Sequence, residues 1–99
     1  MIQMHTARIK VEFDEEPPFI RKPPCPDRII WQKSVYHIEE MLSEWRTDGR
    51  LRSKLLYVGV ARIHYRIRVA GGRIFEIYFD PRTRPGQWIL LAEVFPESD

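Results

Sequence analysis

The sequence contains one cysteine, Cys25, among 99 residues. A single thiol cannot form an internal disulfide, so the composition excludes a small secreted scaffold held together by disulfides. The chain also lacks an apolar run of the roughly 18 residues that a membrane-spanning helix needs. Charged residues interrupt the first ten positions, so the chain does not open on a signal-peptide pattern. We therefore expect a cytoplasmic protein.

The patterns that mark catalytic and metal sites are missing as well. The three histidines are not spaced as ligands from one element, and no second cysteine joins them. No serine lies in a nucleophile-elbow pattern, and no glycine-rich loop precedes a helix in a phosphate-binding arrangement. The runs of carboxylates are of the kind that is usually solvated. We expect a protein that is not an enzyme, with no catalytic residue, metal site or cofactor.

What the chain does have is enough apolar material for one core. Hydrophobic residues make up 43% of the sequence, which can support a single domain over residues 1–99 without disulfides or metal. Within this domain, residues 17–26 contain five prolines. Proline fixes φ and removes a hydrogen-bond donor, so this segment is expected to be a rigid, extended connector. A polyproline ligand for another domain is the alternative interpretation.

Several short segments alternate between apolar and polar side chains, which is typical of half-buried strands. They are residues 7–13, 60–69 and 73–80. Residues 28–31 and 34–38 are β-prone and flank Gln32-Lys33, which predicts a tight hairpin. Residues 88–95 are apolar on both faces apart from Glu93, as in a central strand.

Hairpin links at short intervals predict a mainly β fold, either a small antiparallel barrel or a strongly curved sheet of five to six strands. The residues expected in its core are apolar and come from every predicted strand: Ile9, Val11, Phe13, Ile29, Trp31, Tyr36, Ile38, Leu42, Ile63, Tyr65, Ile67, Phe75, Ile77, Phe79, Leu90 and Val94.

The length of the turn between residues 60–69 and 73–80 decides which side chains of the two strands lie opposite each other. A two-residue loop would set Ile67 opposite Glu76 and mix apolar with charged faces along the whole hairpin. A three-residue loop instead pairs Ile67 with Phe75 and Arg66 with Glu76. We predict the three-residue loop, with Gly72 in the left-handed conformation.

Residues 38–46 are ambiguous. Ile38, Met41, Leu42 and Trp45 have the spacing of an amphipathic helical face. No capping residue stands directly before Ile38, and residues 35–38 already favour a strand, although Ser34 could cap a helix that begins earlier. We favour a continued, bent strand over a short helix around 38–46.

The strongest functional signal is a basic stretch. Residues 49–73 contain seven basic residues and no acid. Alternation places several of them on one strand face, which could bind nucleic-acid phosphates and stack on bases. The candidate nucleic-acid-binding residues are Arg62, His64, Arg66 and Arg68, with Arg50 and Arg52 upstream and Tyr78 across the hairpin from His64.

Two other interpretations of this face remain open. Exposed strands often carry arginine for solubility and edge protection, and Glu39, Glu40, Glu44 or Glu76 could neutralise it. His64 would then be a plain exposed strand residue. The face could also form a protein interface.

Two runs, Ile29 to Trp45 and Tyr65 to Tyr78 followed by Trp88, carry a family resemblance. They resemble an uncharacterised bacterial domain family that occurs as short stand-alone proteins and as a C-terminal appendage of proteins similar to Y-family translesion DNA polymerases. The chain departs from that pattern at Lys33, where a glycine is typical of the first hairpin turn. The resemblance implies the fold and, by analogy only, a link to nucleic acid.

Taken together, these features predict a binding module that is not an enzyme, with weak nucleic-acid binding that does not depend on sequence. The alternative is a protein-interaction or self-associating domain. It would act by strand addition at an open sheet edge, or through the apolar residues 88–95.

Overall fold

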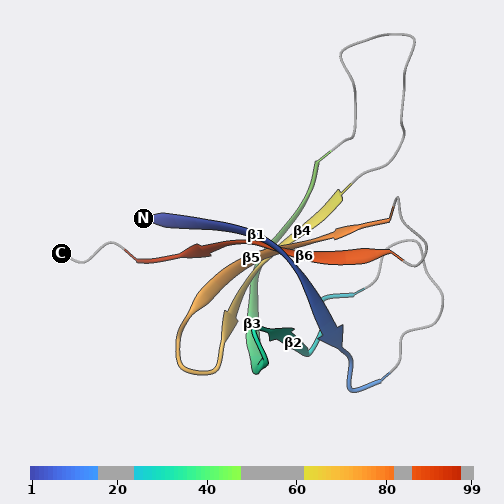
Figure 1. The fold of residues 1–99 in the computed structure, drawn as a ribbon, viewed down its shortest axis with the longest axis horizontal. Helices are drawn as coiled ribbons and strands as arrows, with labels where there is room; N and C mark the ends of the chain where they lie inside the picture. The colour runs from blue at the N-terminus through green and yellow to red at the C-terminus, as the bar shows by residue number, and fades with distance from the viewer. Residues whose placement is uncertain (16–23, 48–61, 82–85, 97–99) are drawn as a thin grey trace, which may run out of the picture.

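The computed structural model describes residues 1–15, 24–47, 62–81 and 86–96, and these form an all-β fold (Figure 1). The six strands are β1 (Ile2–Glu12), β2 (Arg28–Trp31), β3 (Ser34–Thr47), β4 (Arg62–Val69), β5 (Ile74–Asp80) and β6 (Gln87–Val94). Each pairs antiparallel with the next, and β6 pairs with β1, so the sheet closes in a ring. The predicted fold class is confirmed.

The described part of the chain contains no helix, so it holds none that could cross a membrane. Residues 38–46 lie in β3, as favoured above, and not in a short helix.

β3 has two irregularities, and the first explains why Ile38 and Met41 have a helical spacing. The register with β4 shifts between Ile38 and Glu40 and again between Met41 and Ser43. Each shift is a bulge, which adds one residue on β3 and reverses the phase of the in-and-out alternation. Ile38 and Met41 therefore both lie opposite core residues of β4 although they are three positions apart.

The β4–β5 hairpin has the predicted register. Ile67 lies opposite Phe75, and Arg66 lies opposite Glu76. The backbone N–H of Val69 donates to the carbonyl of Arg73 at 2.9 Å, which leaves a three-residue loop. Gly72 has a φ of 92°, and Gly71 before it has a φ of 99°. Both values belong to the region that glycine tolerates and other residues avoid.

The hairpin between β2 and β3 is closed by Gln32 and Lys33 alone, as predicted. Their φ values are 52° and 66°, which is the pattern of a type I′ turn. This turn follows the right-handed twist of the two strands, but it places two residues with a Cβ in the left-handed region. The chain therefore accepts backbone strain at this point.

The core fills the inside of the ring. Its fully buried side chains are Tyr65, Phe75, Ile29, Ile67, Ile77, Leu90 and Val69. Two expected core residues lie elsewhere: Leu42 is 38% exposed because it sits at the second bulge of β3, and Val94 lies opposite Ile2 and Ile74, on the outer side. Trp88, which was not expected in the core, is buried there.

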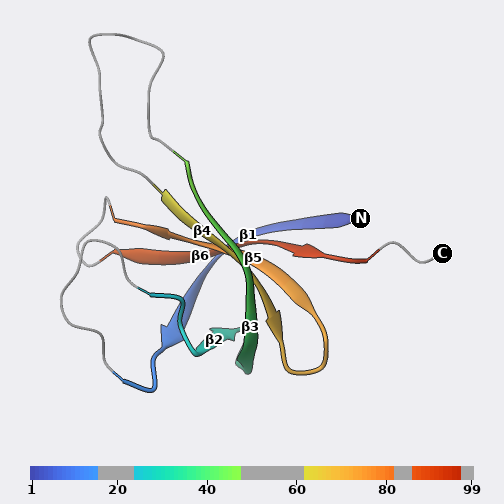
Figure 2. The same ribbon diagram turned by 180° about the vertical axis from the view of Figure 1, so that it is seen from behind.

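β1 joins the two ends of the sheet. Residues 2 to 9 pair with β6, and the register shifts between Met4 and Ala7, where Thr6 has a φ of 50°. The start of β1 and the end of β6 lie side by side when the molecule is seen from the front and from behind (Figure 1 and Figure 2). Only the last three residues of β1, Lys10 to Glu12, pair with β2.

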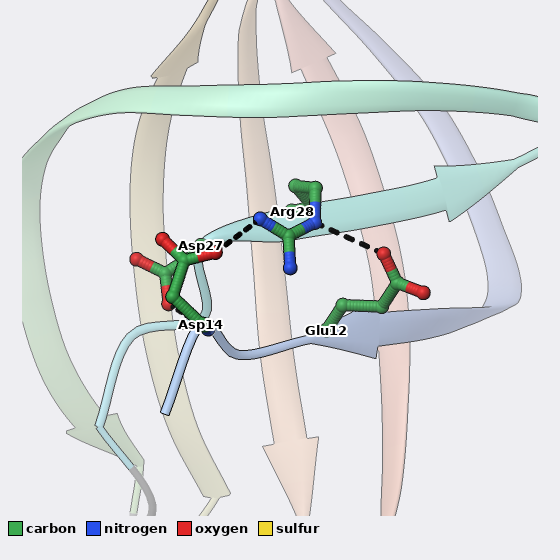
Figure 3. A network of polar contacts seen from close by, with 4 residues as sticks. All are labelled: Glu12, Asp14, Asp27 and Arg28. Atoms are coloured by element: carbon green, nitrogen blue, oxygen red, sulfur yellow. Dashed lines mark hydrogen bonds and ion pairs between the residues drawn. The ribbon is translucent and has the colours of Figure 1, made fainter. Parts of the chain in front are cut away.

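A polar clamp reinforces this short β1–β2 contact (Figure 3). Arg28 Nε donates to Glu12 Oε1 at 3.0 Å, and Arg28 Nη1 donates to Asp14 Oδ1 at 2.5 Å. The backbone N–H of Asp14 donates to Asp27 Oδ2 at 2.7 Å. The first residue of β2 is thereby tied to the last residue of β1 and to the chain just after it.

The β2–β3 turn gives a stability prediction. Lys33→Gly should raise the free energy of unfolding by about 0.5 to 1 kcal/mol, because glycine adopts a positive φ without the cost that a Cβ imposes. Urea denaturation measures this change. As a matched control, Gly72→Ala should lower stability by about 1 kcal/mol, although an added Cβ there would meet no atom within 4 Å. A loss of stability in Lys33→Gly would contradict the strained-turn interpretation.

Candidate functional site

The structure places the described residues of the predicted basic face together on the outer side of β4. Arg62, Arg66 and Arg68 alternate there with buried core residues, and His64 lies opposite Tyr78 of β5. We call Arg62, Arg66 and Arg68 the basic strand face. The other two candidates, Arg50 and Arg52, lie outside the described residues.

Each arginine of the basic strand face has a carboxylate beside it. Arg66 Nε donates to Glu76 Oε1 at 3.1 Å, and Arg68 Nη2 donates to Glu40 Oε2 at 2.7 Å. Arg62 Nε lies 4.0 Å from Asp80 Oδ2. The positive charge of this face is therefore balanced within the sheet, although the three side chains remain 42%, 39% and 41% exposed in the order of the sequence.

An aromatic row crosses the same face. The rings of Trp45 and His64 stack at 5.3 Å, and those of His64 and Tyr78 lie 5.2 Å apart. The guanidinium of Arg62 lies over the ring of Tyr78, 5.1 Å from its centre. His64 and Tyr78 are only 7% and 8% exposed, so the expectation of an exposed His64 was wrong: the neighbouring strands cover both faces of its ring.

This packing also sets the charge of His64. Its Nε2 lies 2.9 Å from Thr47 Oγ1, and its Nδ1 is buried without a hydrogen-bond partner among the described residues. Burial lowers the pKa of His64 and nearby Arg62 lowers it further, while Glu76 acts in the opposite direction. His64 is therefore neutral at pH 7 and adds no positive charge to the face.

A second polar group, not predicted from the sequence, lies at one end of the ring interior. Glu93 is opposite the core residue Phe75. Arg73 holds it with two hydrogen bonds, from Nε to Oε2 at 2.9 Å and from Nη2 to Oε1 at 2.8 Å. Arg73 Nη1 also donates to the hydroxyl of Tyr36 at 3.2 Å. Glu93 is the one acid in the otherwise apolar residues 88–95, and this feature of the sequence could have indicated a buried ion pair.

The electrostatics of this pair favour a structural role. The two hydrogen bonds from Arg73 lower the pKa of Glu93, against the opposing effect of burial. The same bonds raise the pKa of Arg73. Both groups are therefore charged at neutral pH, and each satisfies the other, which leaves no proton to exchange in acid–base chemistry.

The Cys25 thiol is partly buried against the core. Burial first, and then the charges of Asp27 and Glu44, raise its pKa to about 11. The thiol is therefore protonated at neutral pH and is a poor nucleophile. Elsewhere in the described ranges, no three histidine, cysteine, aspartate or glutamate side chains group as metal ligands.

The third feature is an unpaired sheet edge. β2 pairs with β3 only from Ser34 to His37, with one more bond from the N–H of Ile38 to Asp27. From residue 39 to 47, β3 pairs with β4 on one side. In the described ranges, β2 and the residue before it reach no further along β3 than Ile38. We call residues 39–47 the open edge.

The open edge carries exposed apolar side chains. Met41 is 45% exposed and Leu42 is 38% exposed, and residues 39–44 are exposed without interruption. A strand that shows both faces and one edge to solvent is a ready template for another strand.

Comparison with known proteins identifies a family but no individual relative. The family model of a domain of unknown function, DUF6504, matches residues 1–94. Neither the curated proteins nor the solved structures gave a match.

The Arg73–Glu93 pair predicts how stability depends on pH. Glu93→Gln should cost about 1 to 2 kcal/mol near neutral pH, because it leaves a half-exposed guanidinium with a weaker partner. Because folding lowers the pKa of Glu93, its contribution is present above the usual carboxyl pKa and is lost as the pH falls below it. Urea unfolding at several pH values should show the two proteins converging in acid. The exposed Glu15→Gln is the control, and a gap that stays constant with pH would refute this account.

Proposed function

The chain belongs to the DUF6504 family of domains of unknown function, and from the geometry of its strands we propose that it is a protein-binding module and not an enzyme. The open edge of β3 would accept an extended segment of a partner. The observation that carries this proposal is the length of β3: it runs to Thr47, whereas β2 pairs with it only as far as His37.

Strand addition needs free backbone groups and side chains that can pack on the added strand. β3 continues beyond the end of β2, and backbone N–H and C=O groups on that side would supply affinity without regard to sequence. Met41 and Leu42 supply the exposed apolar surface. The two bulges of β3 interrupt this edge, and such irregularities are a common way to limit unspecific pairing between sheets.

Nucleic-acid binding through the basic strand face is the second proposal. Its support is the three half-exposed guanidiniums on one strand. A phosphate could compete with the neighbouring carboxylates for hydrogen bonds from these guanidiniums. The resemblance to a bacterial domain attached to polymerases similar to the Y family supports it by analogy. Against it stand the carboxylates of Glu40, Glu76 and Asp80, and the packed faces of the His64 ring. Both proposals assume a cytoplasmic protein.

A peptide experiment tests the first proposal. A short neutral peptide of alternating threonine and valine should slow hydrogen exchange of the amides at residues 39–47, because strand addition bonds them to the peptide. The double variant Met41→Lys, Leu42→Lys should weaken binding about tenfold or more, since it removes the apolar contacts. Val35→Lys is the matched control, because Val35 is 51% exposed but lies where β3 pairs with β2. If the peptide binds without slowing exchange at these residues, the edge is not the site.

The second proposal predicts weak binding of a fluorescent oligonucleotide at low salt. The affinity should fall steeply as salt increases, because arginine–phosphate contacts release counterions. The double variant Arg66→Ala, Arg68→Ala should reduce both the affinity and the salt slope, by about one unit for each arginine that binds a phosphate. No binding at low salt, or equal binding by the double variant, removes this function from consideration.

A further inference from the structure

We propose that His64 is an acid-sensitive contact for the last residues of β3. While its imidazole is neutral, it holds Trp45 and Thr47 against β4, and uptake of a proton by the imidazole releases residues 45–47. We call these residues the β3 end. The release is local, because the other strand pairs stay in place. It does not depend on which partner the domain binds, so it goes beyond the proposed function.

The first argument is that two side-chain contacts of the β3 end involve the same imidazole. Trp45 lies opposite His64 on the neighbouring strand, and their rings stack at 5.3 Å with 12° between their planes. Thr47 is the last residue of β3, and its Oγ1 lies 2.9 Å from His64 Nε2. A change in the charge of this one group therefore acts on both contacts.

The second argument is that the two sides of the His64 ring are not equally well held. Tyr78, on one side, is 8% exposed and belongs to β5, which pairs with β4 and with β6. Trp45, on the other side, is half-buried, and Arg46 and Thr47 after it are exposed. Exposed strand ends open at a lower free energy than buried strands. The β3 end is therefore the side that yields.

The third argument is the hydrogen bonding of the protonated ring. A neutral imidazole has one N–H group, and an imidazolium has two. The neutral form with its proton on Nε2 donates to Thr47 Oγ1 and keeps a donor off Nδ1. Nδ1 is buried without a hydrogen-bond partner among the described residues. A proton there creates a buried donor without an acceptor, and this cost disappears when the ring reaches water.

The charges around His64 come from the two strands beside it. In the described part of the chain, the titratable and charged side chains on its face are Arg62 and Arg66 of β4 and Glu76, Tyr78 and Asp80 of β5. Arg66 binds Glu76, and Arg62 lies 4.0 Å from Asp80. On β3, Glu44 and Arg46 lie opposite core residues of β4, on the other face of the sheet. An added charge on His64 is therefore repelled by Arg62 and only partly offset by Glu76.

These effects give the direction of the response to pH. Stacking on aromatic faces attracts a cation, but burial first and then Arg62 lower the pKa of His64, with Glu76 opposing them. Once the β3 end opens, the ring returns to its ordinary pKa of 6.5. The open state thus binds a proton more readily than the packed state, and acid favours opening. Above the ordinary pKa both states are neutral, so opening is independent of pH there.

Hydrogen exchange of the unaltered protein tests the proposal, with rates corrected for the intrinsic effect of pH. We expect protection of the amides at residues 45–47 to fall about fivefold or more between pH 7 and pH 5, while the amides of β5 keep theirs. A nuclear magnetic resonance titration of the His64 ring in the same protein should have its midpoint below 6.5.

Two histidine variants locate the effect. His64→Phe keeps a ring beneath Trp45 but cannot take up a proton, so protection of the β3 end should no longer change between pH 7 and pH 5. His37→Phe is the matched control, because His37 lies on the same strand but is exposed, where β3 pairs with β2. It should respond to pH as the unaltered protein does.

Four outcomes would overturn the proposal. They are equal protection of residues 45–47 at pH 7 and pH 5, the same loss of protection in His64→Phe, a midpoint of the His64 titration at or above 6.5, and a loss of protection in all strands together. The last would show that acid unfolds the whole domain and does not release the β3 end. The titration needs no substitution, so it decides the question even if His64→Phe fails to fold.

Discussion

Closure of the ring through β2 is the constraint on which the rest of the structure depends. β2 has four residues, and it links β1 to β3 by antiparallel pairing on both sides. So short a strand is held by its surroundings: the type I′ turn at Gln32 and Lys33 fixes it to β3, and the Arg28 clamp fixes it to β1. Because β2 is so short, it pairs with only the first part of the 14-residue β3. The four residues of β2 thus close the ring, and their small number accounts for the open edge of β3.

The parts of the fold that could be predicted are those in which one face is buried and the strand is regular. In β4 and β5 the alternation is unbroken, so matching apolar faces was sufficient to fix Ile67 opposite Phe75. β3 was ambiguous because its first bulge reverses the alternation and leaves Ile38 and Met41 at a helical spacing. Sequence alone does not show a bulge, because its position depends on the partner strand. The same uncertainty placed Leu42 in the core, whereas it is exposed.

The candidate sites show a similar division. The basic strand face was visible because its arginines alternate on one strand, and the Arg66–Glu76 pair followed from the predicted register. The contact of Arg68 with Glu40 depends on the bulges of β3, so only the general possibility of neutralisation could be foreseen. The Arg73–Glu93 pair depends on a register shift between β5 and β6 that turns Glu93 toward the interior. The burial of His64 could not be predicted, because it depends on the ring of Trp45, which lies opposite His64 on β3.

The pairing of the first strand with the last has a consequence for the order of folding. β2 to β6 each pair with the next strand in the chain, whereas β1 must find β6 across almost the entire sequence, with Ile2 opposite Val94. Pairing between distant residues forms late, because closing a long loop costs entropy before the pairing can stabilise the chain. We therefore expect a meander of five strands, β2 to β6, to form first, while the edge of β6 that later pairs with β1 is still exposed. The rate at which β1 docks then determines how long this edge of β6 is exposed to aggregation.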